Sequence, residues 1–180
     1  MIKNSDSCFV KTVQKFVARE AVGQTAMRNQ GTGVLNAVHI YLDEINLALM
    51  KTNSRSDYME WLDHHTMSLL NKLPVRSKPW GAARKAINLF MRTALYNRYL
   101  NHEFKLEGVE TWMEIPLDSA VARGLRKEVS RGSLPQWPGL KKLTRQVSNQ
   151  FQTFAQSLAD RRDLARAFTL ICIFGWRIDD

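Results

Sequence analysis

The 180-residue chain is long enough to bury a hydrophobic core, and its length fits a single domain over residues 1–180. Hydrophobic residues make up 44% of the chain and charged residues 24%, proportions that exclude a disordered protein. The 26 basic and 17 acidic side chains leave a formal net charge of +9. This excess favours a polyanionic partner, for which we expect nucleic acid rather than an anionic membrane surface; a basic surface without such a partner is the alternative.

Two cysteines, Cys8 and Cys172, are too few for a cysteine-bound zinc or iron–sulfur site and make a disulfide framework unexpected. The polar N-terminus lacks the apolar stretch of a signal peptide. No apolar run approaches the ~20 residues that span a bilayer. We therefore expect an intracellular, cytoplasmic protein without membrane contact, associated with the nucleoid if its source is bacterial or archaeal.

The first half of the chain repeats apolar residues at helical spacing in three segments. The first segment, 9–22, ends at Gly23 and carries on one face Phe9, Val13, Phe16 and Val17. A polar loop over 24–33 precedes a second helix, whose core stripe extends to Leu49. The third helix follows a turn at 53–57 and ends before Pro74.

The second half predicts further helices and no strand. One helix covers 83–100, and 101–114 is ambiguous, with a short helix around 109–113. Asp118 caps the next helix, whose outer face carries Arg123, Arg126, Lys127 and Arg131. A turn region at 132–139 leads to a long helix from Leu140, and a last helix covers 163–176. The prediction is an all-α fold of about eight helices in an irregular bundle.

A Pro/Gly turn runs directly into an amphipathic helix over residues 78–91. A helix N-terminus exposes free N–H groups that bind phosphate, and small residues such as Gly81 and Ala83 let a ligand approach the backbone closely. Lys78 and Arg84 add positive charge there. The alternative is an ordinary connection between two helices with glycine at the corner.

Three segments carry a family resemblance. Residues 81–88 (GAARKAIN) resemble the hairpin and second helix of the helix-hairpin-helix DNA glycosylases, with the hairpin at about 70–100 and Ala83 in place of its second glycine. Residues 115–123 (IPLDSAVAR) resemble the segment that bears the family's aspartate, and residues 167–177 resemble a helix of endonuclease III relatives. The interval of 33 residues from Lys85 to Asp118 is similar to that in archaeal 8-oxoguanine DNA glycosylases.

The resemblance implies a bundle with two lobes around a DNA-binding cleft, and an enzyme that excises a damaged or modified base by breaking its N-glycosidic bond. Lys85 would attack C1′ and lead to strand scission by β-elimination, and Asp118 would stabilise the oxocarbenium-like sugar. Without the resemblance, the local sequence indicates that Lys85 is a solvated charge and that Asp118 is a helix N-cap. The implied DNA contacts are Lys78, Trp80, Gly81, Ala83, Arg84 and Arg123.

Chemistry on a base within a duplex requires the base to leave the stack and enter a pocket. Trp61, Trp80 and Trp176 are candidates for stacking on it, with core packing as the alternative for each. Gln24, Gln30 and His64 are candidates for contacts to its edge. The adjacent pair His64 and His65 points in directions about 100° apart on a helix, which does not suit a metal site, and we expect no metal or cofactor.

The expected partner is double-stranded DNA with a flipped-out base, bound by a monomer. Two other functions stay open. One is a monofunctional glycosylase, in which Asp118 activates water and Lys85 only contacts DNA; its target would be a lesion or an enzymatically modified base, as in defence against foreign DNA. The other is a non-catalytic module that holds the DNA backbone.

Overall fold

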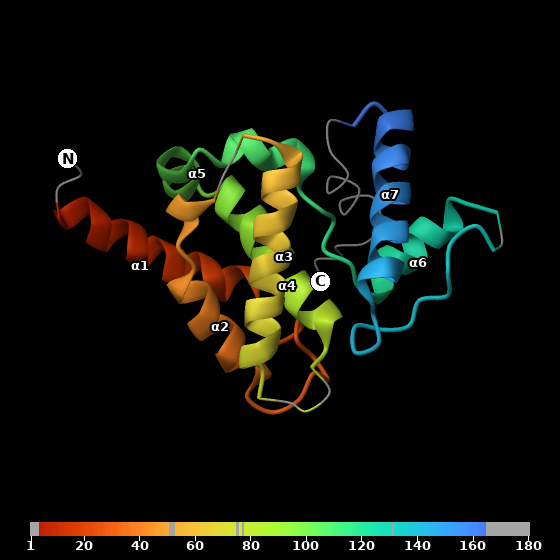
Figure 1. The fold of residues 1–180 in the computed structure, drawn as a ribbon, viewed down its shortest axis with the longest axis horizontal. Helices are drawn as coiled ribbons and strands as arrows, with labels where there is room; N and C mark the ends of the chain where they lie inside the picture. The colour runs from red at the N-terminus through yellow and green to blue at the C-terminus, as the bar shows by residue number, and fades with distance from the viewer. Residues whose placement is uncertain (1–3, 51–52, 75, 77, 131, 165–180) are drawn as a thin grey trace, which may run out of the picture.

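The computed structural model describes residues 4–50, 53–74, 76, 78–130 and 132–164. Every regular element within them is helical, which confirms the all-α prediction (Figure 1). The elements are α1 (Asn4–Ala21), α2 (Val34–Glu44), η1 (Leu47–Leu49), α3 (Arg55–Lys72), α4 (Trp80–Tyr96), α5 (Arg98–Phe104), η2 (Leu106–Trp112), α6 (Ser119–Lys127) and α7 (Arg145–Arg161). Trp176 and the segment 167–177 lie outside the described residues.

Helix α4 forms the centre of the molecule, and each of its residues from Gly81 to Met91 is buried. It contacts α1, α2, α3, α5, η2 and α7. Alanines at positions 82, 83 and 86 are fully buried and allow neighbouring helices to come close, while Ile87 and Phe90 fill the space between them. A helix that is buried on every side places even its charged residues inside the protein.

Short polar side chains set where the helices begin. Ser54, Asn97, Asp118 and Thr144 each accept hydrogen bonds from backbone N–H groups in the first turn of the helix that follows. Asn97 ends the predicted 83–100 helix early, because its side chain caps α5. Thr144 likewise starts α7 at Arg145, where the sequence pattern predicts a start at Leu140. The ambiguous 101–114 region contains the end of α5 and the 3-10 helix η2.

Three predicted core residues are exposed instead: Phe9 at 47%, Phe16 at 62% and Leu49 at 73%. Helix α1 buries the face that contains Gln14 and Val17, which turns both phenylalanines outward. The Gln14 amide donates to the carbonyls of Leu42 and Ile45 at the end of α2. Helix α2 therefore ends at Glu44, and Leu49 falls in a separate 3-10 turn outside its stripe.

An extended segment over 113–118 connects η2 to α6 (Figure 1). It crosses from the helices around α4 to the side where α6 and α7 pack against each other, and α7 also contacts α4. Asp118 stands at the end of this segment, at the start of α6. Among the described helices, none is long and apolar enough to cross a membrane.

Replacing Gly81 with alanine should destabilise the fold. An added Cβ would lie 2.6 Å from the Leu140 carbonyl oxygen and 2.7 Å from Leu143 Cβ, so the turn before α7 must shift. We expect Gly81→Ala to lower the free energy of unfolding by about 1–3 kcal/mol, measured by denaturant titration. Gly23→Ala is the matched control, because nothing lies within 4 Å of its added Cβ. Equal stability of both variants would contradict this packing role.

Candidate functional site

Lys85 and Asp118 meet, although they are 33 residues apart in the chain. Lys85 Nζ donates to Asp118 Oδ2 over 3.2 Å and forms an ion pair. The Lys85 side chain is 10% exposed and that of Asp118 is 33% exposed. The pair therefore sits at the protein surface with the amine covered and the carboxylate still reachable from solvent. The roles that the resemblance implies for Lys85 and Asp118 require both side chains at one sugar, and the structure brings the two together.

The Asp118 carboxylate is held through both oxygens. Oδ1 accepts from the backbone N–H groups of Ala120 and Val121 at 2.9 and 3.0 Å, which caps α6, while Oδ2 accepts from Lys85. Backbone donors and a helix N-terminus both favour a negative charge at this position. The N-cap role and the contact with Lys85 thus coexist in one side chain.

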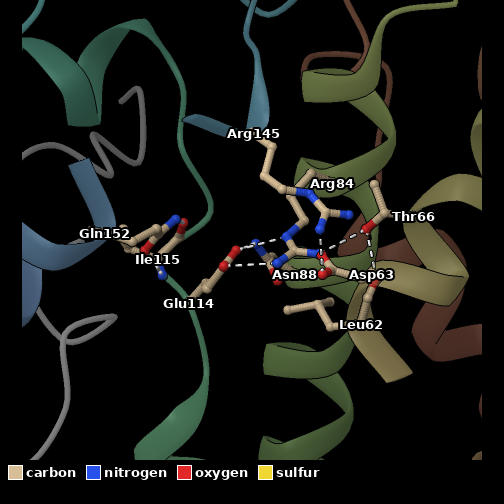
Figure 2. A network of polar contacts seen from close by, with 9 residues as sticks. All are labelled: Leu62, Asp63, Thr66, Arg84, Asn88, Glu114, Ile115, Arg145 and Gln152. Carbon is tan, nitrogen blue, oxygen red and sulfur yellow. Dashed lines mark hydrogen bonds and ion pairs between the residues drawn. The ribbon is translucent and has the colours of Figure 1, made fainter. Parts of the chain in front are cut away.

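A buried polar network fixes the segment that leads to Asp118 (Figure 2). Arg84 donates through Nε and Nη2 to the two oxygens of Glu114, each over 2.8 Å. Its Nη1 donates to Asp63 Oδ1 at 2.8 Å and to Thr66 Oγ1 at 3.1 Å on α3. Burial alone lowers the pKa of Arg84, but the hydrogen bonds and charges of Glu114 and Asp63 outweigh it and raise that pKa. The guanidinium therefore stays charged and joins α3, α4 and the extended segment.

Two amides complete the support of this segment. Asn88 Nδ2 donates to Glu114 Oε2 at 3.0 Å. Gln152 on α7 accepts from the Ile115 N–H at 3.0 Å and donates to the Ile115 carbonyl at 2.8 Å (Figure 2). The segment is held from the α4 side by Arg84 and from the α7 side by Gln152. Asp118 follows three residues after Ile115, so its position depends on both.

Three predicted DNA contacts are buried in the structure, which leaves little access for a phosphate. Arg84 is 3% exposed and bound to carboxylates, so it offers no donor to a phosphate. Gly81 and Ala83 lie inside the first turns of α4, and the 140–143 turn covers Gly81. The helix begins at Trp80, three residues before the predicted start, which places this glycine within the helix instead of in a hairpin loop. Gly81 is needed for packing.

The other predicted DNA contacts differ in how accessible they are. Arg123 is exposed on α6. Lys78 is exposed too, but its ammonium donates to the carbonyls of Asn71 and Leu73 at 2.9 Å each, at the end of α3. Trp80 is half-buried, with its ring 5.5 Å from the Arg84 guanidinium carbon. Arg123 therefore presents the freest charge of this group.

Among the described residues that were predicted to line the base pocket, Trp61 lies on α3, and Gln24 and Gln30 lie in the loop between α1 and α2. Trp61 is buried on α3 and lines a pocket of about 350 Å³. That pocket is lined by Asn46, Leu49, Asp57, Glu60, Trp61, His64 and His65. Gln24 is exposed and Gln30 is buried in the loop between α1 and α2, where the Gln30 amide donates to the Arg28 carbonyl. In the described ranges, no cluster of three or more metal-ligating side chains occurs.

Sequence reasoning missed Glu114, Gln152 and Trp137. Glu114 directly precedes Ile115-Pro116, and a charge beside a buried extended segment is the available signal for its role. Gln152 has no such signal, because only the tertiary fold brings it to Ile115. Trp137 lies between two prolines in the 132–139 turn region. A half-exposed tryptophan near a basic helix face is a candidate for nucleic-acid stacking.

Comparisons with known protein families, with curated proteins and with solved structures give no match to this chain.

Glu114→Gln should strongly destabilise the protein, because it removes the charge of the carboxylate that binds the buried Arg84 through two hydrogen bonds and leaves only Asp63 as a negative partner. We expect the free energy of unfolding to fall by about 3 kcal/mol or more, measured by denaturant titration. Glu107→Gln, which changes an exposed residue of η2, is the control and should change it by less than about 0.5 kcal/mol. A Glu114→Gln variant as stable as the control would show that the network contributes little.

His65 should remain neutral to unusually low pH. Burial, with a smaller contribution from the charge of His64, lowers the pKa of His65 from 6.5 to about 4. Tyr41 Oη lies 2.6 Å from His65 Nδ1 in a hydrogen bond, and the Trp61 ring centre is 4.4 Å from that of His65.

Between pH 6.5 and about 4 the unfolded chain binds this proton more readily than the folded protein. The contribution of His65 to stability is therefore complete above pH 6.5 and declines as the pH falls towards 4. An NMR titration, with the ring signals assigned by their loss in His65→Gln, should give a midpoint near 4. A midpoint near 6.5 would contradict the buried, neutral ring.

Proposed function

We propose that this protein is a DNA glycosylase of the helix-hairpin-helix class, which excises a damaged or modified base and carries an abasic-site lyase activity. The ion pair between Lys85 and Asp118, at 3.2 Å, is the observation that carries the proposal. It joins the two side chains that the chemistry requires, at a place where one of them is open to solvent. The net charge of +9 supports DNA as the partner.

The chemistry would start with a sugar entering at the exposed edge of Asp118. The bond between C1′ and the base nitrogen breaks, its electron pair leaves with the base, and the negative Asp118 stabilises the cationic sugar. In the resting ion pair Lys85 carries a proton that must leave before Nζ attacks C1′. Asp118 Oδ2 is near enough to accept it and to pass it to the departing base. Nζ bonds to C1′ and loses a further proton, and the C1′–O4′ bond then breaks, which opens the sugar ring and leaves a Schiff base between C1′ and Nζ. Loss of a proton from C2′ then expels the 3′ phosphate by β-elimination.

One observation favours the monofunctional version. The Lys85 side chain is 10% exposed while Asp118 is 33% exposed, so water reaches the carboxylate more easily than a substrate reaches the amine. In that version Asp118 takes a proton from water, the oxygen of that water bonds to C1′, and Lys85 holds Asp118 in place. The two versions give different products, an intact abasic strand or a cleaved one.

Borohydride trapping tests the proposal. The protein is incubated with duplexes that each carry one damaged or modified base, and base release, strand cleavage and the covalent adduct are measured. We expect an adduct with the wild type, its loss in Lys85→Gln, and base release slowed by about 10²–10⁴-fold in Asp118→Asn. Lys142→Gln, an exposed lysine ahead of α7, is the matched control and should behave as the wild type.

Each of the other outcomes has a definite meaning. An undiminished adduct in Lys85→Gln refutes the lyase assignment. Full base release by Asp118→Asn refutes the catalytic aspartate. Base release without any adduct selects the monofunctional enzyme. Salt-sensitive binding without release from any of these duplexes selects the non-catalytic DNA-binding module.

A further inference from the structure

A pocket of about 640 Å³ lies on the outer side of α6, next to the candidate site. Its volume falls within the range of about 300–1,000 Å³ that is common for ligand sites. Ser119, the residue after Asp118, forms one side of it, and Trp137 forms another. The pocket thus begins one residue from the proposed catalytic carboxylate.

Three cationic side chains of α6 line this pocket: Arg123, Arg126 and Lys127. They follow one another at helical spacing and are all exposed. Within the described part of the chain, none of the three forms a salt bridge or a side-chain hydrogen bond. The neighbouring acid, Glu128, is already paired with Arg162 at 2.6 Å. The positive charge of the pocket is therefore available to an anion.

Trp137 is held in one orientation although it is half-exposed. Its Nε1 donates to Ser119 Oγ at 3.1 Å, and its ring meets Phe151 of α7 edge to face, with ring centres 5.7 Å apart. A ring that is fixed before a ligand arrives loses little conformational entropy on binding. An aromatic ring beside unpaired cations offers a surface for a base and donors for its phosphate.

A neighbouring pocket shows that this charge is localised. The second pocket, of about 830 Å³, shares Gly132 and Leu134 with the first and is larger. Its polar side chains are uncharged, among them Gln146, Asn149, Gln150 and Thr153. Among the described residues, cations thus line the pocket that contains Trp137, and none lines the second pocket.

We propose that the pocket formed by Ser119, Arg123, Arg126, Lys127 and Trp137 binds an unstacked nucleotide of DNA. Its base stacks on Trp137, and its phosphates contact the three cations of α6. This inference rests on the proposed function in taking DNA as the ligand, but it needs no catalysis. It assigns a binding site separate from the Lys85–Asp118 pair.

Binding of a fluorescein-labelled thymidine oligonucleotide, followed by anisotropy over a series of salt concentrations, tests this site. We expect Trp137→Leu to weaken binding about ten-fold or more. Arg126→Gln combined with Lys127→Gln should reduce the slope of log K against log salt by about 1.4, since each phosphate contact to a single strand contributes about 0.7. Lys11→Gln combined with Lys15→Gln removes two exposed charges of α1 and is the matched control.

Wild-type affinity in Trp137→Leu, or equal salt slopes in the two double variants, overturns the site. Heparin, a polyanion without bases, serves as a competitor of the oligonucleotide. The site is also overturned if heparin displaces the oligonucleotide fully and if the α1 control variant weakens heparin binding as much as the α6 variant does. A general basic surface would then explain the binding. The proposed function is refuted by a different result, the absence of base release from every modified duplex. Stacking on Trp137 is measured whether or not any base is released, so the two failures are distinguishable.

Discussion

The bidentate ion pair between Arg84 and Glu114 is the contact on which the arrangement of the site depends. Arg84 is next to Lys85 on α4, and Glu114 lies four residues before Asp118. The network therefore aligns the helix that carries the amine with the segment that carries the carboxylate. Taking both charges out of water is costly, and the hydrogen bonds from Asn88 and to Asp63 offset part of that cost. A buried polar network whose members are hydrogen-bonded to one another favours a single defined geometry.

This arrangement assigns different tasks to neighbouring charges. Arg84 and Lys85 are adjacent basic residues on α4. Arg84 is enclosed by carboxylates, whereas Lys85 contacts a carboxylate at the surface. The two acidic partners on the extended segment differ in the same way: Glu114 is buried, and Asp118 is partly exposed to solvent. The buried pair fixes the arrangement of α4 and the extended segment, and the outer pair is the one whose carboxylate is open to solvent.

The sequence predicted the helices with strong periodicity, the cap at Asp118 and the approach of Lys85 to it. It misplaced residues whose surroundings are set by distant parts of the chain. Gly81 looks like a hairpin glycine locally, but the 140–143 turn covers it. Arg84 looks like a phosphate ligand, but Glu114 and Asp63 enclose it. Phe9 and Phe16 follow a helical stripe, but α1 buries a different face. Local pattern identifies helices; it does not identify which face the rest of the fold covers.

The pairing of Gln152 with Ile115 has a consequence for the order in which the protein takes shape. A side-chain amide here supplies the two hydrogen bonds that a neighbouring strand would give, across a separation of 37 residues. Contacts of such separation form late, because the chain must close a long loop before they contribute. A nascent chain that has not yet emerged as far as α7 can hold Lys85 on its helix while Asp118 still lacks this support. The contact from Gln152 is therefore added only after α7 has been made, whereas Arg84 and Glu114 can already pair before it.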